Sequence, residues 1–410
     1  MKRRIFYRII FSLFFLISLL SVFSWFQGGS KVLYPIFLCL IIEAIREKML
    51  NKKILLFSLA ALVIHILSFF TSTLFYSLPF NYSWFIQGIL LILLIPSGIV
   101  VIKNPDNFKE FKNIGKVFYW ITLACGIFGA YQGISNDGIN WILNGYSQEF
   151  SYSFVSSMDI GIIKQTYPFY LNLLFLLLWK DLPKKKLIPL LIVDFLLLLL
   201  FGSRTILFSM VIILIVIAIN TTIKNLNKRK IVLGSFGLSF LVFFYIFKEE
   251  IYQITTSSGR FIFQLFTSET FWTRPFGVGL GNFTKSVDLG VWDNIKIDNL
   301  SSQTIVRLLQ NTDLATATSH SLFPIAESDL ILIGVSFGFL VFLIWVWLGA
   351  KYIRKFLIIN TPIGKPYHSS LLIFIFIFLS GFLNDYLSFL PTWLFLSIAI
   401  NSIEYKNNNI

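Results

Sequence analysis

Long apolar runs, separated by short polar links, recur along the whole chain of 410 residues. A helix needs about 17–25 mostly apolar residues to cross a bilayer core that is roughly 30 Å thick. Twelve runs meet or approach this length, and they predict an all-α polytopic membrane protein with about 12 transmembrane helices. The expected spans are residues 9–26, 32–45, 54–75, 84–102, 117–133, 162–179, 187–202, 205–222, 231–247, 325–349, 369–384 and 391–404.

Basic residues are concentrated on alternate links between these spans. The N-terminal segment and five links carry four Lys or Arg each, and with Lys406 they hold 25 of the 34 basic residues. Because cytoplasmic loops of membrane proteins carry an excess of Lys and Arg, both termini and these links are predicted to be cytoplasmic. The five links are residues 46–53, 103–116, 180–186, 224–230 and 350–368.

The composition agrees with a membrane protein. Hydrophobic residues make up 56% of the chain and charged residues 13%, against about 45–50% and 25% in soluble domains. This balance excludes an ordinary cytosolic enzyme. A net charge of +14 would indicate nucleic-acid binding in a soluble protein. Here the predicted outer side has nine basic and thirteen acidic residues, so no nucleic-acid partner is expected.

Two predicted outer links are long, namely residues 134–161 and 248–324. Loops of this length in compact proteins are usually functional. Within the second link, apolar residues recur at three- and four-residue spacing over 300–310, which predicts a surface helix. We therefore expect one integral-membrane domain, residues 1–410, that contains a large and partly helical periplasmic loop at 248–324.

Three arginines on the predicted outer side are candidates for anion binding. Arg204 lies between spans seven and eight, where its guanidinium can bind two phosphate oxygens at headgroup level. Its alternative role is that of an interfacial side chain that snorkels toward water. Arg260 lies near the start of the long loop, and Arg274 precedes glycines 277, 279 and 281. These glycines permit tight turns and close approach of the backbone.

His320 is the only histidine on the predicted outer side. Its ordinary pKa lies near neutrality, so it can accept a proton from a hydroxyl group, although a structural role remains the alternative. Glu327 and Asp329 lie near the start of span ten, where the helix dipole favours acidic side chains. No group of residues has the spacing of a metal site, and we expect neither a metal nor a cofactor.

Asp194 lies near the middle of span seven. A charged group in hydrocarbon is costly, so this side chain should face the helix bundle and have a partner there. Hydrogen bonding between helices is the favoured role, and a proton relay is the alternative.

Four short motifs lie at the outer ends of predicted spans or in the long loop. They are Gly202-Ser203-Arg204-Thr205, Ser258-Gly259-Arg260, the run from Pro275 to Phe283, and Ser319-His320-Ser321. In this order and at these membrane positions, they resemble the O-antigen polymerase and O-antigen ligase superfamily of bacterial envelope enzymes. The family often has His-Asn where this chain has His320-Ser321. The stretch Glu327-Ser328-Asp329, followed by Phe337-Gly338, resembles the polymerases more closely than the ligases.

The resemblance implies a metal-independent, inverting glycosyltransferase of the bacterial inner membrane. Its donor and acceptor would be oligosaccharides linked to undecaprenyl diphosphate, and a flippase and a chain-length regulator are possible partners. Arg204 and Arg260 would hold the diphosphate leaving group, and His320 would orient or deprotonate the acceptor hydroxyl. Arg274, Glu327 and Asp329 would contribute to substrate binding.

Three other functions remain open at this point. An O-antigen ligase would use the same donor but transfer the glycan to lipid A–core. A flippase or another carrier would place polar groups near the midplane, often in two related halves, whereas this chain has Asp194 as its one clear mid-span charge. A structural scaffold fits the layout but assigns no role to His320.

Overall fold

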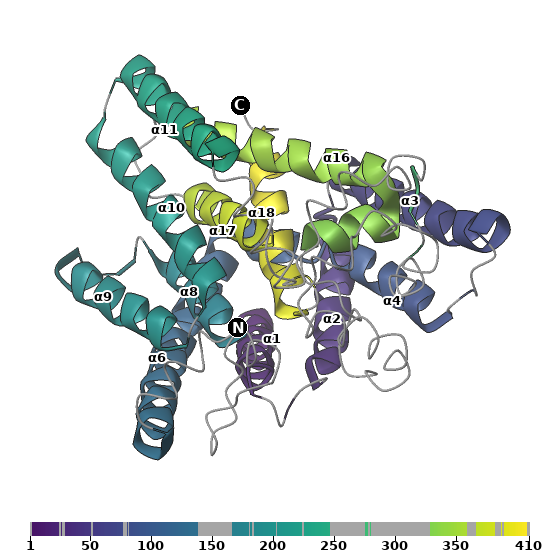
Figure 1. Cartoon of the computed structure of the whole chain (residues 1–410). Helices are drawn as coiled ribbons and strands as arrows, with labels where there is room; N and C mark the ends of the chain where they lie inside the picture. The colour runs from purple at the N-terminus through teal and green to yellow at the C-terminus, as the bar shows by residue number, and fades with distance from the viewer. Residues whose placement is uncertain are drawn as a thin grey trace.

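A computed structural model gives the arrangement of most of the chain (Figure 1). Within the predicted loop 248–324, the structure describes only four residues, 275–277 and 279. The described residues are 2–23, 26, 29–50, 52–76, 80, 82–137, 166–179, 181–182, 184–201, 203, 204–223, 225–246, 275–277, 279, 329–358, 366–381, 387 and 389–407.

The described part of the chain is helical almost throughout and contains no β-strand, which confirms the all-α prediction. At least one helix lies in each of the twelve apolar runs. The helices are α1 (Lys2–Leu20), η2 (Gly29–Val32, a 3-10 turn), α2 (Leu33–Arg46), α3 (Lys52–Tyr76), α4 (Tyr82–Leu93), α5 (Ile99–Lys103), α6 (Pro105–Asp137), α8 (Thr166–Leu178), α9 (Lys184–Leu200), α10 (Arg204–Thr222), α11 (Leu226–Ile246), α16 (Asp329–Ile358), α17 (Pro366–Ser380) and α18 (Pro391–Asn407).

Three helices in the described residues are long and apolar enough to cross a bilayer, within Lys52–Phe75, Pro105–Ser135 and Ser336–Lys355. Five further apolar helices of 10–17 residues accompany them. These lengths indicate a membrane protein. The figure of twelve spans stays a prediction, because several helices are shorter than a full crossing requires.

The predicted single span 84–102 is wrong in one respect, because two helices occupy it. α4 ends at Leu93, and α5 begins at Ile99 after a turn that contains Pro96. Proline lacks the backbone N–H that an α-helix needs in its interior, which accounts for a break here. The turn is anchored to α18, since the N–H of Gly98 donates to Ser397 Oγ at 2.7 Å.

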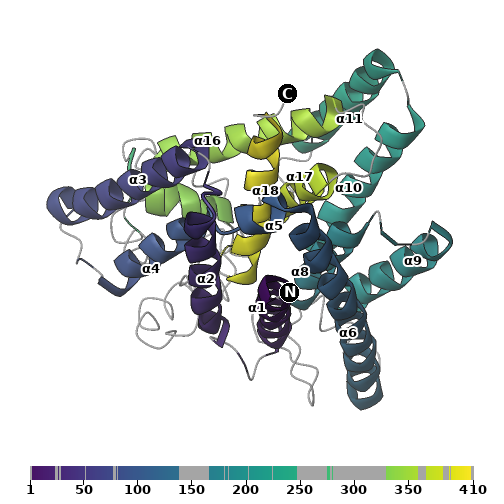
Figure 2. The same ribbon diagram turned by 180° about the vertical axis from the view of Figure 1, so that it is seen from behind.

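α18 lies at the centre of the bundle, with α17 packed along it (Figures 1 and 2). α8 packs on α6 and α17, α1 packs on α6, and α3 packs on α4 and α16. Buried residues follow one another from Tyr167 to Leu178 in α8 and from Ser369 to Phe378 in α17. A helix that is apolar on every side belongs in an interior position, and these two occupy the core.

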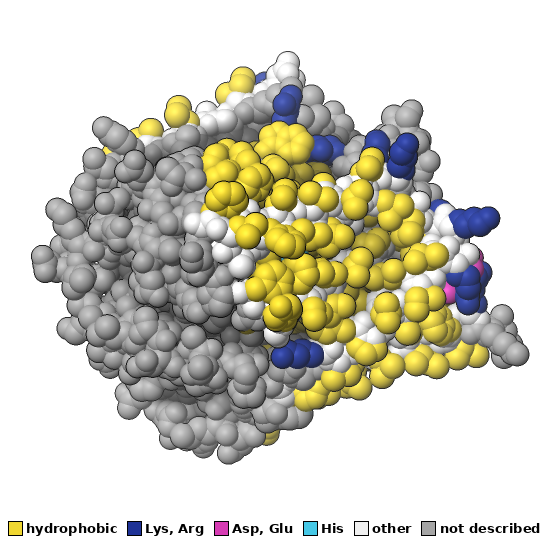
Figure 3. Space-filling model, turned by 90° about the vertical axis from the view of Figure 1, so that its right-hand side faces the viewer, with side chains coloured by type: hydrophobic (Ala, Val, Ile, Leu, Met, Phe, Trp, Pro, Cys, Tyr) yellow, Lys and Arg dark blue, Asp and Glu magenta, His cyan; other side chains and the backbone are white. Residues whose placement is uncertain are grey.

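Large apolar side chains also cover much of the outer surface. On α3, Leu74 is 72% exposed and Phe75 is 77% exposed. Figure 3 shows a broad apolar face on which Lys and Arg side chains gather mainly near the margins. Exposed apolar patches beyond a few hundred square ångströms are unusual on soluble monomers, whereas an apolar belt with charged edges suits contact with lipid.

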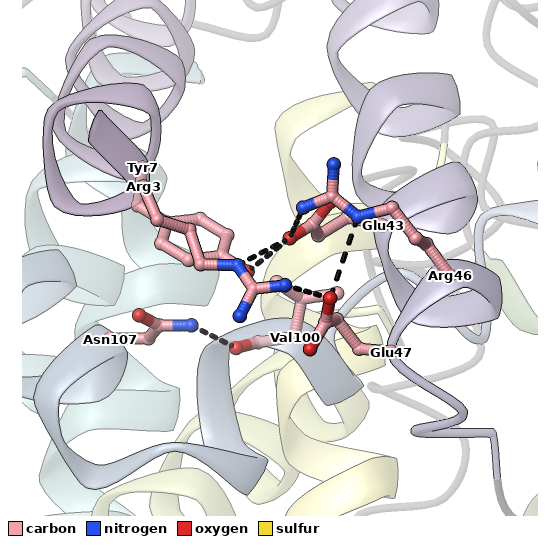
Figure 4. Close-up of polar contacts among 7 residues, drawn as sticks. All are labelled: Arg3, Tyr7, Glu43, Arg46, Glu47, Val100 and Asn107. Atoms are coloured by element: carbon pink, nitrogen blue, oxygen red, sulfur yellow. Dashed lines mark hydrogen bonds and ion pairs between the residues drawn. The ribbon is translucent and has the colours of Figure 1, made fainter.

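A buried carboxylate joins the first two long helices, α1 and α2 (Figure 4). Glu43 is 3% exposed and accepts hydrogen bonds from Tyr7 Oη at 2.8 Å and Arg46 Nη2 at 2.6 Å. Arg3 Nε lies 3.3 Å from Glu43 Oε1, and Arg3 also pairs with Glu47. Tyr7 precedes the predicted span 9–26; burial and then the bond to Glu43 raise the pKa of Tyr7 to about 12, so its hydroxyl remains a donor.

Two further ion pairs lie at the ends of predicted spans that were assigned to the cytoplasmic side. Arg8 Nε lies 2.5 Å from Glu110 Oε1, and Lys112 Nζ lies 2.5 Å from Asp181 Oδ2. In addition, Lys103 Nζ donates to the carbonyl of Lys48 at 3.2 Å. The contacts connect the N-terminal segment with α6, link 46–53 with link 103–116, and link 103–116 with link 180–186. These four basic segments therefore lie next to one another, while the prediction that they, link 224–230 and link 350–368 face the cytoplasm stays a prediction.

Candidate functional site

A short segment of the predicted outer loop is anchored on α16. The N–H of Gly279 donates to the carbonyl oxygen of Ser336 at 2.9 Å. The same oxygen accepts a second hydrogen bond, from Ser68 Oγ of α3, at 2.6 Å. One carbonyl group therefore connects the loop, span ten and span three.

Gly338 makes this contact possible. Its φ of 83° and ψ of 171° interrupt the helical geometry of α16 and produce a kink. Only glycine adopts this region of backbone conformation readily. Space imposes a second restriction, because a Cβ atom here would lie 2.2 Å from the carbonyl oxygen of Pro275 and 2.5 Å from the nitrogen of Gly277. The backbone of the loop thus occupies the position that a side chain would need.

The loop itself turns at glycines. Gly277 has a φ of 68° and Gly279 a φ of 81°, both in the left-handed region that side chains disfavour. The prediction of tight turns and close backbone approach is confirmed at these two positions. Gly281, the third glycine of the alternating series, lies outside the described residues.

An apolar cavity of about 290 Å³ lies beside the kink. α3, α4, α16 and α18 enclose it, and Phe337 follows the anchored Ser336 directly in its wall. Its lining is apolar, and Ile64, Trp345 and Trp393 are among the side chains that contribute to it. The cavity therefore suits a hydrocarbon chain and lacks the polar groups that would orient a sugar or a phosphate inside it.

His65 lies behind the wall of this cavity and is fully buried. Its Nε2 is 2.9 Å from the carbonyl oxygen of Phe85, which assigns Nε2 as the protonated nitrogen. The ring stacks on Phe85 with an interplanar angle of 14°. Gly88 leaves room for it, since a Cβ there would lie 2.2 Å from the imidazole Cε1. The residue joins α3 to α4, a role that its position in span three did not by itself reveal.

Asp194 faces the bundle, as predicted, and is 2% exposed. Asn172 Nδ2 of α8 lies 3.5 Å from Asp194 Oδ1, at the long limit of a hydrogen bond. Asn172 Nδ2 also donates to the carbonyl of Pro168 at 2.9 Å. The expected contact between helices is therefore present, and it joins α8 to α9.

The sequence-predicted site residues lie largely outside the described part of the chain. Arg204 is the first residue of α10 and Asp329 the first of α16, so their backbones are placed and their side chains are not described. α10 and α3 lie on opposite sides of α18 in both ribbon views (Figures 1 and 2). The helix of Arg204 is therefore not beside the docked loop. Four candidates, Arg260, Arg274, His320 and Glu327, fall outside the described residues.

No group of three or more His, Cys, Asp or Glu side chains in the described residues is arranged to hold a metal ion. No protein-family model, no curated protein and no solved structure matches the chain. The similarity to the O-antigen polymerases and ligases therefore rests on the four motifs, their order and their predicted membrane positions.

Proposed function

We propose that this protein is a membrane glycosyltransferase that polymerises lipid-linked oligosaccharide repeat units at the outer face of the bacterial inner membrane. The observation that carries the proposal is the anchoring of Gly279 on Ser336. It holds the motif that follows Arg274 against a membrane helix, within a large loop. A loop fixed to a rigid helix can present substrate-binding groups at a defined height above the bilayer.

The proposed donor is a glycan on undecaprenyl diphosphate, whose anionic group lies at headgroup level. Arg204, at the start of α10, and Arg260 would bind this diphosphate. The charge on the diphosphate grows as the glycosidic bond breaks, and guanidinium groups stabilise it without a metal ion. The predicted outer side carries more acidic than basic residues, so binding would depend on these few arginines instead of on bulk charge.

The proposed acceptor is a second lipid-linked repeat unit. Its hydroxyl would attack the anomeric carbon of the donor and displace the diphosphate with inversion, and His320 would take the hydroxyl proton. The acceptor carries its own diphosphate at the far end of its repeat unit. Arg274 is bonded to Pro275 of the docked loop, so it is a candidate for this second anion.

A deletion strain separates this function from its rivals, with surface polysaccharide analysed on a gel. Loss of a polymerase leaves a single repeat unit on the lipid A–core. Loss of a ligase leaves bare core and accumulates lipid-linked polymer in the periplasm. Loss of a flippase also leaves bare core, but the lipid-linked units remain on the cytoplasmic side. Bare core would therefore contradict the proposal.

A further inference from the structure

The apolar cavity lies along one side of α16, on both sides of the kink at Gly338. Beyond the kink its lining residues run from Val341 to Leu348, which corresponds to roughly 10 Å of helix at about 1.5 Å per residue. The cavity opens on the lateral surface of the protein. Two residues of its wall are exposed there, Ile344 to 45% and Phe57 of α3 to 37%. A chain lying in the surrounding lipid can therefore enter it from the side.

Two basic residues of α16 follow Leu348, the last residue of this helix in the cavity wall. Lys351 follows Leu348 by one helical turn, and Arg354 follows by a second turn. Lys351 Nζ lies 4.8 Å from the ring centroid of Trp347, a cation–π contact that holds the ammonium group over this ring. Both basic residues belong to link 350–368, which is predicted to be cytoplasmic.

α3 contributes basic charge at the same level. Ser68 bonds to the carbonyl of Ser336; Lys53 precedes Ser68 by fifteen residues, and Lys351 follows Ser336 by fifteen. Span three is predicted to run outward and span ten inward, so Lys53 of α3 and Lys351, in the part of α16 after the kink at Gly338, are both predicted to lie toward the same membrane surface. Phe57, which lines the cavity, lies one turn from Lys53.

We infer that this cavity is a binding site for an anionic phospholipid of the cytoplasmic leaflet. One acyl chain occupies the apolar cavity, and the phosphate contacts Lys53, Lys351 and Arg354. Basic pockets between membrane helices on the cytoplasmic side are suited to anionic headgroups. The inference does not rest on the proposed function, because the lipid-linked sugars carry their phosphates at the opposite, outer end.

Tryptophan fluorescence provides the test, since Trp345 and Trp393 line the cavity. The full-length protein is placed in phosphatidylcholine bilayers, and phosphatidylglycerol or phosphatidylcholine with brominated acyl chains, which quench tryptophan on contact, is titrated in. Each basic residue near the surface favours an anionic lipid by about fivefold. We expect brominated phosphatidylglycerol to quench at a much lower mole fraction than brominated phosphatidylcholine. High salt should weaken this preference for the anionic lipid. Equal quenching by the two lipids overturns the inference.

Matched variants test whether the preference for the anionic lipid depends on Lys351 and Arg354. The double variant Lys351→Gln with Arg354→Gln removes two positive charges, and at about fivefold per charge it should reduce the preference by about twenty-five-fold. Lys109→Gln with Lys116→Gln removes two exposed lysines from α6, on the same predicted side, and should leave the preference unchanged. An equal loss in both pairs overturns the inference. Displacement of the brominated lipid by undecaprenyl diphosphate but not by phosphatidylglycerol would assign the cavity to the substrate and also overturn it.

If the Lys351/Arg354 double variant fails to fold, the salt dependence of quenching in the wild-type protein tests the inference instead. A quenching preference that does not change between about 0.05 and 0.5 M salt contradicts an electrostatic headgroup contact. Native mass spectrometry supplies an independent readout, in which phosphatidylglycerol should remain bound to the wild-type protein after delipidation to a greater extent than phosphatidylcholine.

Discussion

The backbone N–H of Gly279 donates to the carbonyl oxygen of Ser336 at 2.9 Å, although the two residues belong to different predicted parts of the chain. Gly279 belongs to the large outer loop and Ser336 to span ten. Because Ser336 lies two residues before the kink at Gly338, the loop is docked where α16 departs from helical geometry. The loop and the kink are therefore expected to depend on each other.

Replacement of Gly338 by alanine tests this dependence. The substitution places a side chain in a backbone region that costs about 1–3 kcal/mol for residues other than glycine. It also forces the loop away, since the new Cβ would lie 2.2 Å from the Pro275 carbonyl oxygen. We expect a lower thermal unfolding midpoint in detergent and reduced glycan polymerisation.

Gly234 of α11 is the matched control, because a Cβ there meets nothing within 4 Å. Alanine in a helix interior is favoured over glycine by about 0.5–1 kcal/mol, so Gly234→Ala should unfold at the wild-type temperature or slightly above it. If Gly338→Ala is as stable and as active as Gly234→Ala, the docked loop is not important for the fold or the activity.

Glu43→Gln should weaken the junction of α1 and α2. The amide removes the negative charge that Arg46 and Arg3 face while leaving Tyr7 with an acceptor. Hydrogen bonds to charged groups contribute about 1.5–3 kcal/mol, and partial exposure of the arginines places the expected loss near the lower value. Chemical denaturation in mild detergent measures it.

Glu47→Gln provides the comparison, because the Glu47 side chain is 25% exposed against 3% for Glu43. Its loss should be below about 1 kcal/mol, as for exposed ion pairs. A loss at Glu47 equal to that at Glu43 would show that burial of the carboxylate does not determine the strength of the junction.

Asp194→Asn should leave both folding and polymerisation close to wild type. The amide keeps the size of the carboxylate and offers an oxygen to Asn172 Nδ2, which lies 3.5 Å from Asp194 Oδ1. Asp194→Leu removes the contact with Asn172. It should lower stability by about 0.6 kcal/mol, the average for a hydrogen bond between membrane helices. Loss of polymerisation in a well-folded Asp194→Asn protein would instead point to proton transfer by the carboxyl group.

The proposed chemistry predicts that three outer residues have large effects on rate. Arg204→Ala and Arg260→Ala should each slow polymerisation by about 10²–10³, as for loss of one group that stabilises transition-state charge. His320→Ala should slow it by about 10²–10⁴. Lys296→Ala, in the same predicted loop, should remain near wild type. Near-normal rates in the Arg204 and Arg260 variants would exclude them as the diphosphate-binding pair.

The hydrophobic pattern alone predicted the positions of the helices well. In an apolar environment the backbone N–H and C=O groups of each run must bond to one another, and a helix achieves this within a single segment. It failed at residues 94–98, where Pro96 breaks the expected span and Ser397 of the distant α18 binds the turn at Gly98. A contact between residues so far apart in sequence leaves no periodic signal. The same reason explains why the packing of His65 against Gly88 was not predicted.

Charge and motif patterns were informative to different extents. The distribution of Lys and Arg grouped the N-terminus with links 46–53, 103–116 and 180–186, and ion pairs connect these segments in the structure. The glycine motif correctly indicated a close backbone approach, but its contact at Ser336 depends on a kink that local propensity does not specify. The roles of Arg260, Arg274, His320 and Glu327 stay predictions.

The most direct test of the proposed function uses the purified full-length protein and one synthetic lipid-linked oligosaccharide repeat unit. No metal and no nucleotide sugar are added. The proposal predicts a ladder of longer lipid-linked products, each one repeat unit larger than the last, with free undecaprenyl diphosphate released at every addition. Unchanged substrate in the presence of folded protein, or movement of the lipid across liposomes without a new glycosidic bond, would contradict it.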